Sequence, residues 1–125
     1  MIGYAMLGTN DIARARRFYD PLMAQLGAAP VAEYSSATRV WYARDTVGLI
    51  VITEPYDGKP ATVGNGSMLA LPLASRAAVR EAHAKALQLG ARNEGDPGIR
   101  VAPFYGAYFR DPDGHKFALY CLTPE

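Results

Sequence analysis

A pattern that returns after 64 residues is the feature that most constrains the fold of this 125-residue chain. Asp11 and Ser75 lie 64 positions apart, and each can cap the amphipathic helix that follows it. Few residues are identical between the two copies, but the buried helical positions correspond. The same shift places Ala15 on Val79, Phe18 on Ala82, Leu22 on Ala86 and Met23 on Leu87.

Each copy is predicted to contain a strand, a helix and three further strands. In the first helix, Pro21 lacks a backbone N–H and predicts a break at Asp20, and Gly27 is expected to end the helix. The second helix is expected to run from Ser75 to Gly90. Strands are expected at 2–7, 30–34, 38–43 and 48–53 in the first copy, and at 67–73, within 92–103, and at 105–110 and 116–122 in the second.

The chain is therefore expected to form a single α+β domain over residues 1–125. Its modules span residues 1–53 and 67–125, joined by a linker, 54–66, that is rich in turn-forming residues. One module has too few strands to close a core alone. We expect the two βαβββ modules to pair into a curved mixed sheet with the helices outside, and the concave face to form a cleft for a small ligand.

Composition argues against several classes of function. Thirteen basic and twelve acidic residues leave a formal net charge of +1, too little to attract nucleic acid. Cys121 is the only cysteine, so no internal disulfide can form. No stretch is apolar enough to cross a bilayer and no secretion leader is evident, so we expect a cytoplasmic protein with no membrane partner.

Three segments carry a resemblance to a known superfamily: LGTNDIARARRFY at 7–19, DGKPATVGNG at 57–66 and YGAYFRDPDGH at 105–115. Together they resemble the glyoxalase/bleomycin resistance protein/dioxygenase superfamily, also called the vicinal oxygen chelate proteins, over essentially the whole chain. The resemblance implies the paired-module fold and a homodimer. It does not imply one reaction, because this fold hosts lyases, isomerases, epimerases, ring-cleaving dioxygenases and drug-sequestering proteins.

Metal-dependent members bind a divalent ion through His, Gln or Glu on the first and last strands of each module. The resemblance places these positions at Tyr4, Ile50, Met68 and Ala118. Ile50 and Ala118 have no donor atom. Met68 offers only a soft thioether, and the tyrosine hydroxyl of Tyr4 is a rare metal ligand. We therefore expect no cofactor and a subgroup without metal ligands. A divalent metal is expected only if the strand register differs from this assignment.

Aromatic and methionine side chains are the remaining candidates for a binding site, since the chain has eight Tyr, four Phe and one Trp. Strand alternation turns Phe117, Leu119 and Cys121 toward the helices. The opposite face is left for the ligand, with Arg39 or Arg110 as the anchor for an acidic group. The predicted pocket consists of Tyr4, Met6, Trp41, Met68, Tyr105, Tyr108 and Tyr120, together with these two arginines.

Three hypotheses of function follow. The first is metal-free binding of a small apolar or aromatic molecule in the sheet cleft, with no catalytic residue identified. The second is a metal-dependent enzyme, either a lyase resembling lactoylglutathione lyase or a dioxygenase. The third is a dimeric scaffold without ligand, in which the aromatic residues form core and dimer interface. The two histidines, His83 and His115, are expected to have structural roles.

Overall fold

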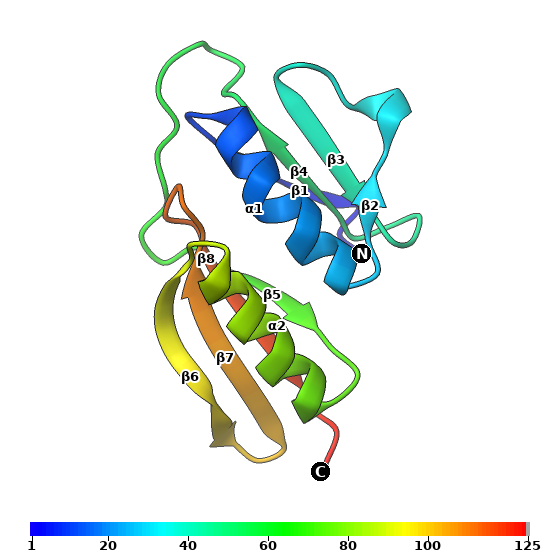
Figure 1. Cartoon of the computed structure of the whole chain (residues 1–125), viewed down its shortest axis with the longest axis vertical. Helices are drawn as coiled ribbons and strands as arrows, with labels where there is room; N and C mark the ends of the chain where they lie inside the picture. Colours follow the sequence, from blue (N-terminus) through cyan, green and yellow to red (C-terminus); the bar gives the residue numbers. More distant parts are fainter. Residues whose placement is uncertain (125) are drawn as a thin grey trace. The chain divides into compact units, whose positions relative to one another are not determined.

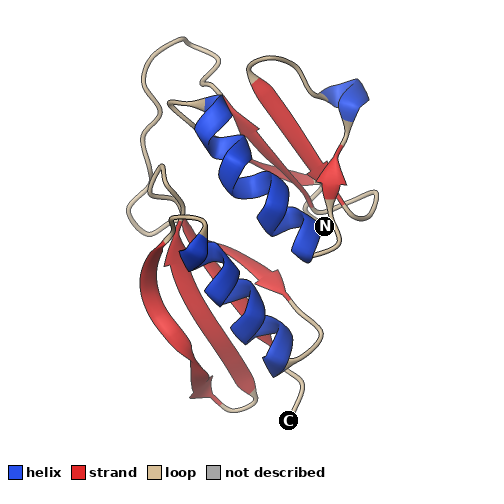
Figure 2. Ribbon diagram, in the orientation of Figure 1, coloured by secondary structure: helices blue, strands red, loops and turns tan. Residues whose placement is uncertain are grey.

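A computed structural model of the chain describes residues 1–124 and contains two compact units, Met1–Val63 and Gly64–Glu125. Each unit has one α-helix and one four-stranded mixed sheet, so the fold class is α+β, as predicted (Figures 1 and 2). The first unit comprises β1 (Tyr4–Gly8), α1 (Ile12–Gln25), β2 (Ala29–Pro30), a 3₁₀ turn η1 (Ala32–Tyr34), β3 (Arg39–Ala43) and β4 (Leu49–Thr53). The second comprises β5 (Leu69–Pro72), α2 (Arg76–Gln88), β6 (Arg92–Val101), β7 (Phe104–Arg110) and β8 (Lys116–Cys121).

The strand order confirms that the chain repeats one structural pattern. The first sheet has the order β1-β4-β3-β2 and the second has the order β5-β8-β7-β6. In each sheet the first strand of the unit pairs in parallel with the last strand, and the other pairs are antiparallel. The two sheets are therefore equivalent, strand by strand.

Both helices begin where the sequence predicts. The Asp11 side chain accepts a hydrogen bond from the Arg14 amide at 2.9 Å, and the Ser75 hydroxyl accepts one from the Ala78 amide at 3.1 Å. These bonds satisfy amides that have no partner within the helix. After α1, Gly27 adopts a φ of +82°, a left-handed conformation that favours glycine.

Helix α1 continues through Pro21, so the predicted break at Asp20 is wrong. Proline removes one backbone hydrogen bond from the helix interior. The helix nevertheless buries Tyr19 before the proline and Leu22 and Met23 after it. Packing of these side chains on the sheet outweighs the local cost of Pro21, which helix propensity alone could not indicate.

The segment 30–34 is not the strand that its composition predicts. Ala29–Pro30 pairs with β3, the Val31 amide still donates to the Trp41 carbonyl at 2.8 Å, and the chain then turns into η1. Ser35 accounts for the turn, because its hydroxyl donates to the Val31 carbonyl at 2.8 Å and accepts from the Trp41 amide at 3.2 Å. This side chain replaces the ladder that a longer β2 would have formed.

The predicted linker 54–66 is held in part by the first unit. The Asn10 side chain donates to the Ala61 carbonyl at 3.2 Å and accepts from the Ala61 amide at 2.7 Å. Gly8 lies next to the same residue, where an added Cβ would come within 2.9 Å of the Ala61 side chain. The segment therefore packs back on the start of α1 before the chain enters the second unit.

Candidate functional site

The sheet of the first unit has one face covered by α1. On its other face Tyr4 and Met6 are exposed, whereas Val51 and Thr53 are buried. Tyr42 of β3 points to the helix, because its hydroxyl donates to Asp20 of α1 at 2.5 Å and its ring lies 6.1 Å from that of Tyr19. Neighbouring residues on a strand point to opposite sides, so Trp41 and Arg39 lie on the face away from α1. We call this face the N-terminal open face. It consists of Tyr4, Met6, Arg39, Trp41, Leu49, Val51 and Thr53.

An aromatic cluster occupies the N-terminal open face. The Trp41 ring lies 4.8 Å from the Tyr4 ring and 5.8 Å from the ring of Tyr34, which η1 places beside the sheet. Tyr4, Met6 and Tyr34 are 53%, 45% and 61% exposed. Exposed apolar groups gathered around one ring provide area that a planar molecule could cover.

Arg39 lies beside this cluster, and one edge of its guanidinium group is hydrogen-bonded within the unit. Its Nε donates to Thr53 Oγ1 at 3.0 Å, and the Thr53 hydroxyl donates to the Glu54 carbonyl at 2.8 Å. Within residues 1–124, Arg39 has no carboxylate partner. Its terminal nitrogens therefore remain available to a ligand.

The sheet of the second unit also has an open face, which we call the C-terminal open face: Phe104, Tyr108, Arg110, Lys116, Ala118 and Tyr120. The Phe104 and Tyr120 rings stack with their centroids 5.0 Å apart. The Tyr108 ring lies 5.2 Å from the Arg100 guanidinium and 5.7 Å from the Lys116 ammonium. These aromatic groups already have partners within the unit.

Arg110 differs from Arg39 because protein groups already engage its guanidinium. Its Nε donates to Glu94, and its Nη1 donates to the Gly114 carbonyl at 2.9 Å. The hydrogen bond from Arg110 lowers the pKa of the Glu94 carboxyl. Glu94 therefore neutralises the charge of Arg110. On sequence alone, Arg110 and Arg39 are equally good anchors for an acidic group.

The predicted pocket residues fall in four places, and Tyr105 is the one residue buried beneath a helix. Tyr4, Met6, Arg39 and Trp41 share the N-terminal open face. Tyr108, Arg110 and Tyr120 share the C-terminal open face, and Met68 precedes β5 and is exposed.

Tyr105 does not belong to either open face, which corrects the prediction. Its side chain is buried on the α2 side of the sheet, where the Arg76 guanidinium lies 5.1 Å from its ring and Arg80 Nη1 donates to its hydroxyl at 3.4 Å. The reason is alternation along β7. Phe104, Gly106 and Tyr108 occupy the opposite face.

One of the four expected metal positions is also wrong. Ile50 is buried on the α1 side, since it pairs with Tyr42 and Ala5. On the open face, Met6 pairs with Val51, as Ala70 pairs with Ala118 in the second unit. The corrected set is Tyr4, Val51, Met68 and Ala118.

The corrected positions do not fit a divalent ion. Val51 has no donor atom, as Ile50 had none, and Ala118 has none either. A divalent ion needs several oxygen or nitrogen donors, which one phenol and one thioether do not supply. Within residues 1–124, no group of three His, Cys, Asp or Glu side chains could hold a metal.

Comparison with known proteins decides the family. The family model of the Glyoxalase/Bleomycin resistance protein/Dioxygenase superfamily matches residues 1–119. The chain belongs to this superfamily. A glyoxalase/bleomycin resistance protein from Albidiferax ferrireducens T118 is 36% identical, with a TM-score of 0.87 and 99% of each chain covered.

More distant superfamily structures share the fold alone. A family enzyme from Burkholderia phytofirmans PsJN is 17% identical, with a TM-score of 0.80, over 97% of this chain and 98% of that chain. The fosfomycin resistance protein FosX from Mesorhizobium loti is 20% identical, with a TM-score of 0.69, over 98% and 92%. A comparison with curated protein sequences gives no match.

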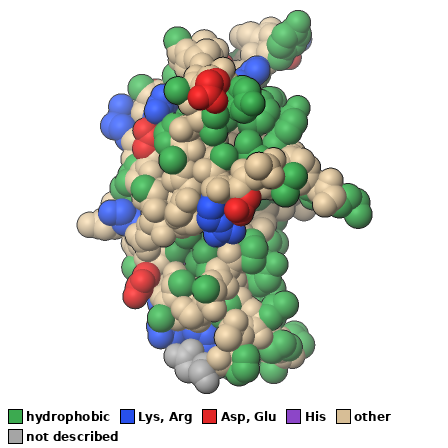
Figure 3. Space-filling model, turned by 90° about the vertical axis from the view of Figure 1, so that its right-hand side faces the viewer, with side chains coloured by type: hydrophobic (Ala, Val, Ile, Leu, Met, Phe, Trp, Pro, Cys, Tyr) green, Lys and Arg blue, Asp and Glu red, His purple; other side chains and the backbone are tan. Residues whose placement is uncertain are grey.

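The surface of this superfamily member is mixed in charge. On the face that Figure 3 shows, Lys and Arg side chains are scattered among hydrophobic and acidic ones and do not gather into a basic stripe. Nucleic-acid-binding proteins concentrate basic side chains on one surface. Within residues 1–124, no helix has the length and apolar character needed to span a bilayer.

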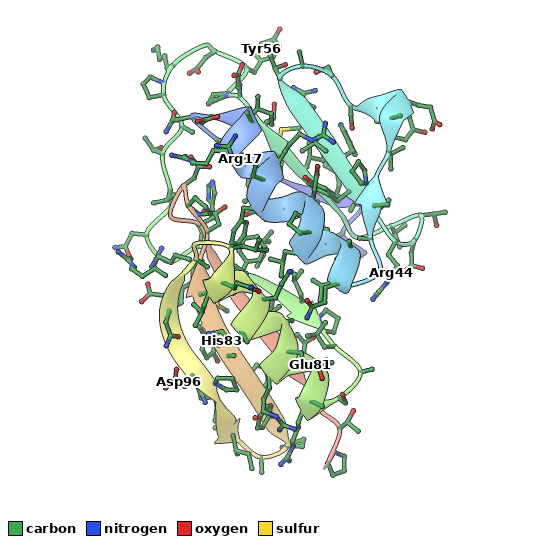
Figure 4. The ribbon with its side chains drawn as sticks, viewed as in Figure 1. Arg17, Arg44, Tyr56, Glu81, His83 and Asp96 are labelled. Carbon is green, nitrogen blue, oxygen red and sulfur yellow. The ribbon has the colours of Figure 1, made fainter. Side chains whose placement is uncertain are left out.

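Both histidines have contacts within the fold. His83 of α2 is buried beside β7, with Nε2 3.0 Å from the Tyr108 carbonyl oxygen (Figure 4). Because a carbonyl only accepts, His83 Nε2 carries the proton in this contact. The His115 amide donates to Asp111 at 2.8 Å in the turn between β7 and β8. The His83 contact fits the structural role that the sequence predicts, whereas the His115 bond is made by its backbone amide and does not test the role of its ring.

The Tyr42–Asp20 hydrogen bond joins β3 to α1 and was not predicted. Burial of Tyr42, followed by its hydrogen bond with Asp20, raises the pKa of the phenol. The two residues are 22 positions apart, so only the packed unit brings them together. The only sequence signal was a tyrosine where strand alternation places an apolar, helix-facing residue.

We expect Tyr42→Phe to change the pH dependence of stability. The unfolded phenol titrates near pH 10, whereas folded Tyr42 keeps its proton to higher pH. The contribution of folded Tyr42 to the free energy of unfolding is therefore complete below about pH 10, and it is lost as pH rises through the folded pKa. Urea unfolding between about pH 8 and 11 should show the wild type losing more stability than Tyr42→Phe above pH 10. If the free energies of unfolding of the wild type and of Tyr42→Phe change in parallel with pH, the raised pKa of Tyr42 is contradicted.

Proposed function

We propose that this superfamily member binds a small apolar or aromatic molecule, without a metal, at the N-terminal open face. The observation that carries the proposal is Trp41, flanked by Tyr4 and Tyr34 on a sheet face that α1 leaves uncovered. Covering apolar area contributes about 25 cal/mol per Å², and well-oriented aromatic pairs add about 0.5–1.5 kcal/mol. Met6 adds an adaptable apolar group at the edge of this surface.

The proposal excludes any step through a metal, because Tyr4, Val51, Met68 and Ala118 do not form a donor set for a divalent ion. It therefore differs from the lyase and dioxygenase hypothesis in the metal content that it predicts for the purified protein. It differs from the scaffold hypothesis because a scaffold would show no saturable binding of small aromatic compounds. Names of similar structures refer to drug resistance, and this supports a small-molecule ligand in general terms only.

Trp41 fluorescence can report ligand binding, since Trp41 is the only tryptophan of the chain. A screen of aromatic metabolites should yield compounds that raise the melting temperature and also change Trp41 fluorescence. At 100 times its Kd, a ligand stabilises the folded state by about 2.7 kcal/mol. A fluorescence change with no thermal shift, or a screen with neither effect, would reject the proposal.

Metal analysis of protein purified without chelators is the companion measurement. We expect zinc, iron, manganese and nickel far below one equivalent after dialysis, and an unchanged melting temperature in EDTA. The reason is that the positions used for metal ligands in the superfamily do not carry several oxygen or nitrogen donors in this chain. A stoichiometric ion that survives dialysis would favour the metal-dependent enzyme instead.

A further inference from the structure

We infer that the ligand of the N-terminal open face is an aryl carboxylic acid, whose ring packs on Trp41 while its carboxylate pairs with Arg39. This inference rests on the proposed function and adds the chemical class of the ligand.

The position of Arg39 relative to Trp41 suits a molecule that has an aromatic ring at one end and an anionic group at the other. Arg39 and Trp41 are two residues apart on β3, so their side chains stand on the same face with origins about 7 Å apart. A planar ring on Trp41 and an anion on Arg39 therefore need a short connecting arm of two or three carbons. The compound 3-phenylpropionate has this form.

Hydrogen bonding leaves Arg39 ready for a carboxylate. The bond from Nε to Thr53 Oγ1 engages one edge of the guanidinium and limits its rotation. Thr53 is itself buried and anchored to the Glu54 carbonyl. The two terminal nitrogens can then donate to the two oxygens of one carboxylate, a geometry that arginine provides and lysine does not.

Charge distribution favours an acid over a neutral compound. Arg39 is the only charged residue of the N-terminal open face, and no carboxylate within residues 1–124 pairs with it. A neutral ligand would remove water from this charge without replacing the lost hydrogen bonds. Arg110 provides the contrast, because Glu94 and the Gly114 carbonyl already engage it.

The experiment compares 3-phenylpropionate with 3-phenylpropanamide, which has the same ring and arm but no charge. Binding is measured by calorimetry with the whole chain at low salt. We expect the acid to bind roughly tenfold more tightly than the amide, because hydrogen bonds to charged groups are the stronger ones. Arg39→Gln should abolish this preference by weakening acid binding more than amide binding, and Arg110→Gln should preserve the preference.

The outcomes separate the two proposals. Equal binding of acid and amide by the wild type would overturn the acid inference and leave the aromatic site intact. Absence of binding by both compounds, together with a flat aromatic screen, would overturn the proposed function and the inference with it. If Arg39→Gln does not fold, the salt dependence of wild-type binding decides, since only an ion-paired acid loses affinity as salt rises.

Discussion

Replacing Phe117 with alanine is expected to lower the free energy of unfolding by about 3–5 kcal/mol. Phe117 of β8 is fully buried, and its ring stacks on Phe109 with the centroids 5.2 Å apart. Truncation removes apolar contacts and leaves a cavity beneath α2, where neighbouring strands hold the backbone in place. Urea denaturation followed by far-ultraviolet circular dichroism measures the loss.

Phe104→Ala is the matched control for Phe117→Ala. Phe104 also stacks on an aromatic ring, that of Tyr120, at 5.0 Å, but on the C-terminal open face. Because Phe104 is only partly buried, its truncation leaves no enclosed cavity, and we expect a clearly smaller loss. Equal losses would show that the open face contributes as much to the core as the helix-covered face does.

Trp41→Ala is expected to weaken binding of an aromatic ligand by at least about 30-fold, the effect of losing a central aromatic anchor. Trp41 contacts both Tyr4 and Tyr34, so its removal also separates the other two rings. Calorimetry measures the loss, since the variant has no tryptophan fluorescence. Circular dichroism must show that the variant remains folded.

Two further variants make the Trp41 result specific. Trp41→Phe retains a planar apolar ring and should keep much of the affinity. Tyr56→Ala removes a fully exposed aromatic from the segment between β4 and β5 and should leave affinity unchanged (Figure 4). Unchanged affinity in folded Trp41→Ala would place the ligand elsewhere in the molecule.

Much of the fold could be predicted because its signals are local. The caps Asp11 and Ser75 and the strands around Trp41 and Phe117 depend on residues within a few positions of one another. Helix α1 continued through Pro21 because burial of its neighbours compensates for a local penalty. Ser35 ended the predicted strand through bonds to Val31 and Trp41, a turn that composition does not reveal.

Part of the candidate site could be predicted, and the rest depended on strand register. Alternation correctly grouped Tyr4 with Met6, and Phe117 with Leu119, because it needs only neighbouring positions. Ile50 and Tyr105 were assigned to the wrong faces, because a one-residue error turns a side chain to the other side of the sheet. Tyr34 was missed because η1, and not a strand, brings it to Trp41.

The amino-acid sequence by itself determined the repeated α+β pattern, the start of each helix and the superfamily. It also showed that two of the four expected metal positions have no donor atom, and this holds for the original and for the corrected set. Only the tertiary structure decided which arginine is available to a ligand. That choice depends on partners distant in the chain: Arg110 meets Glu94 16 residues away, and Arg39 meets Thr53 14 residues away. Folding creates such contacts, and no local pattern in the sequence encodes them.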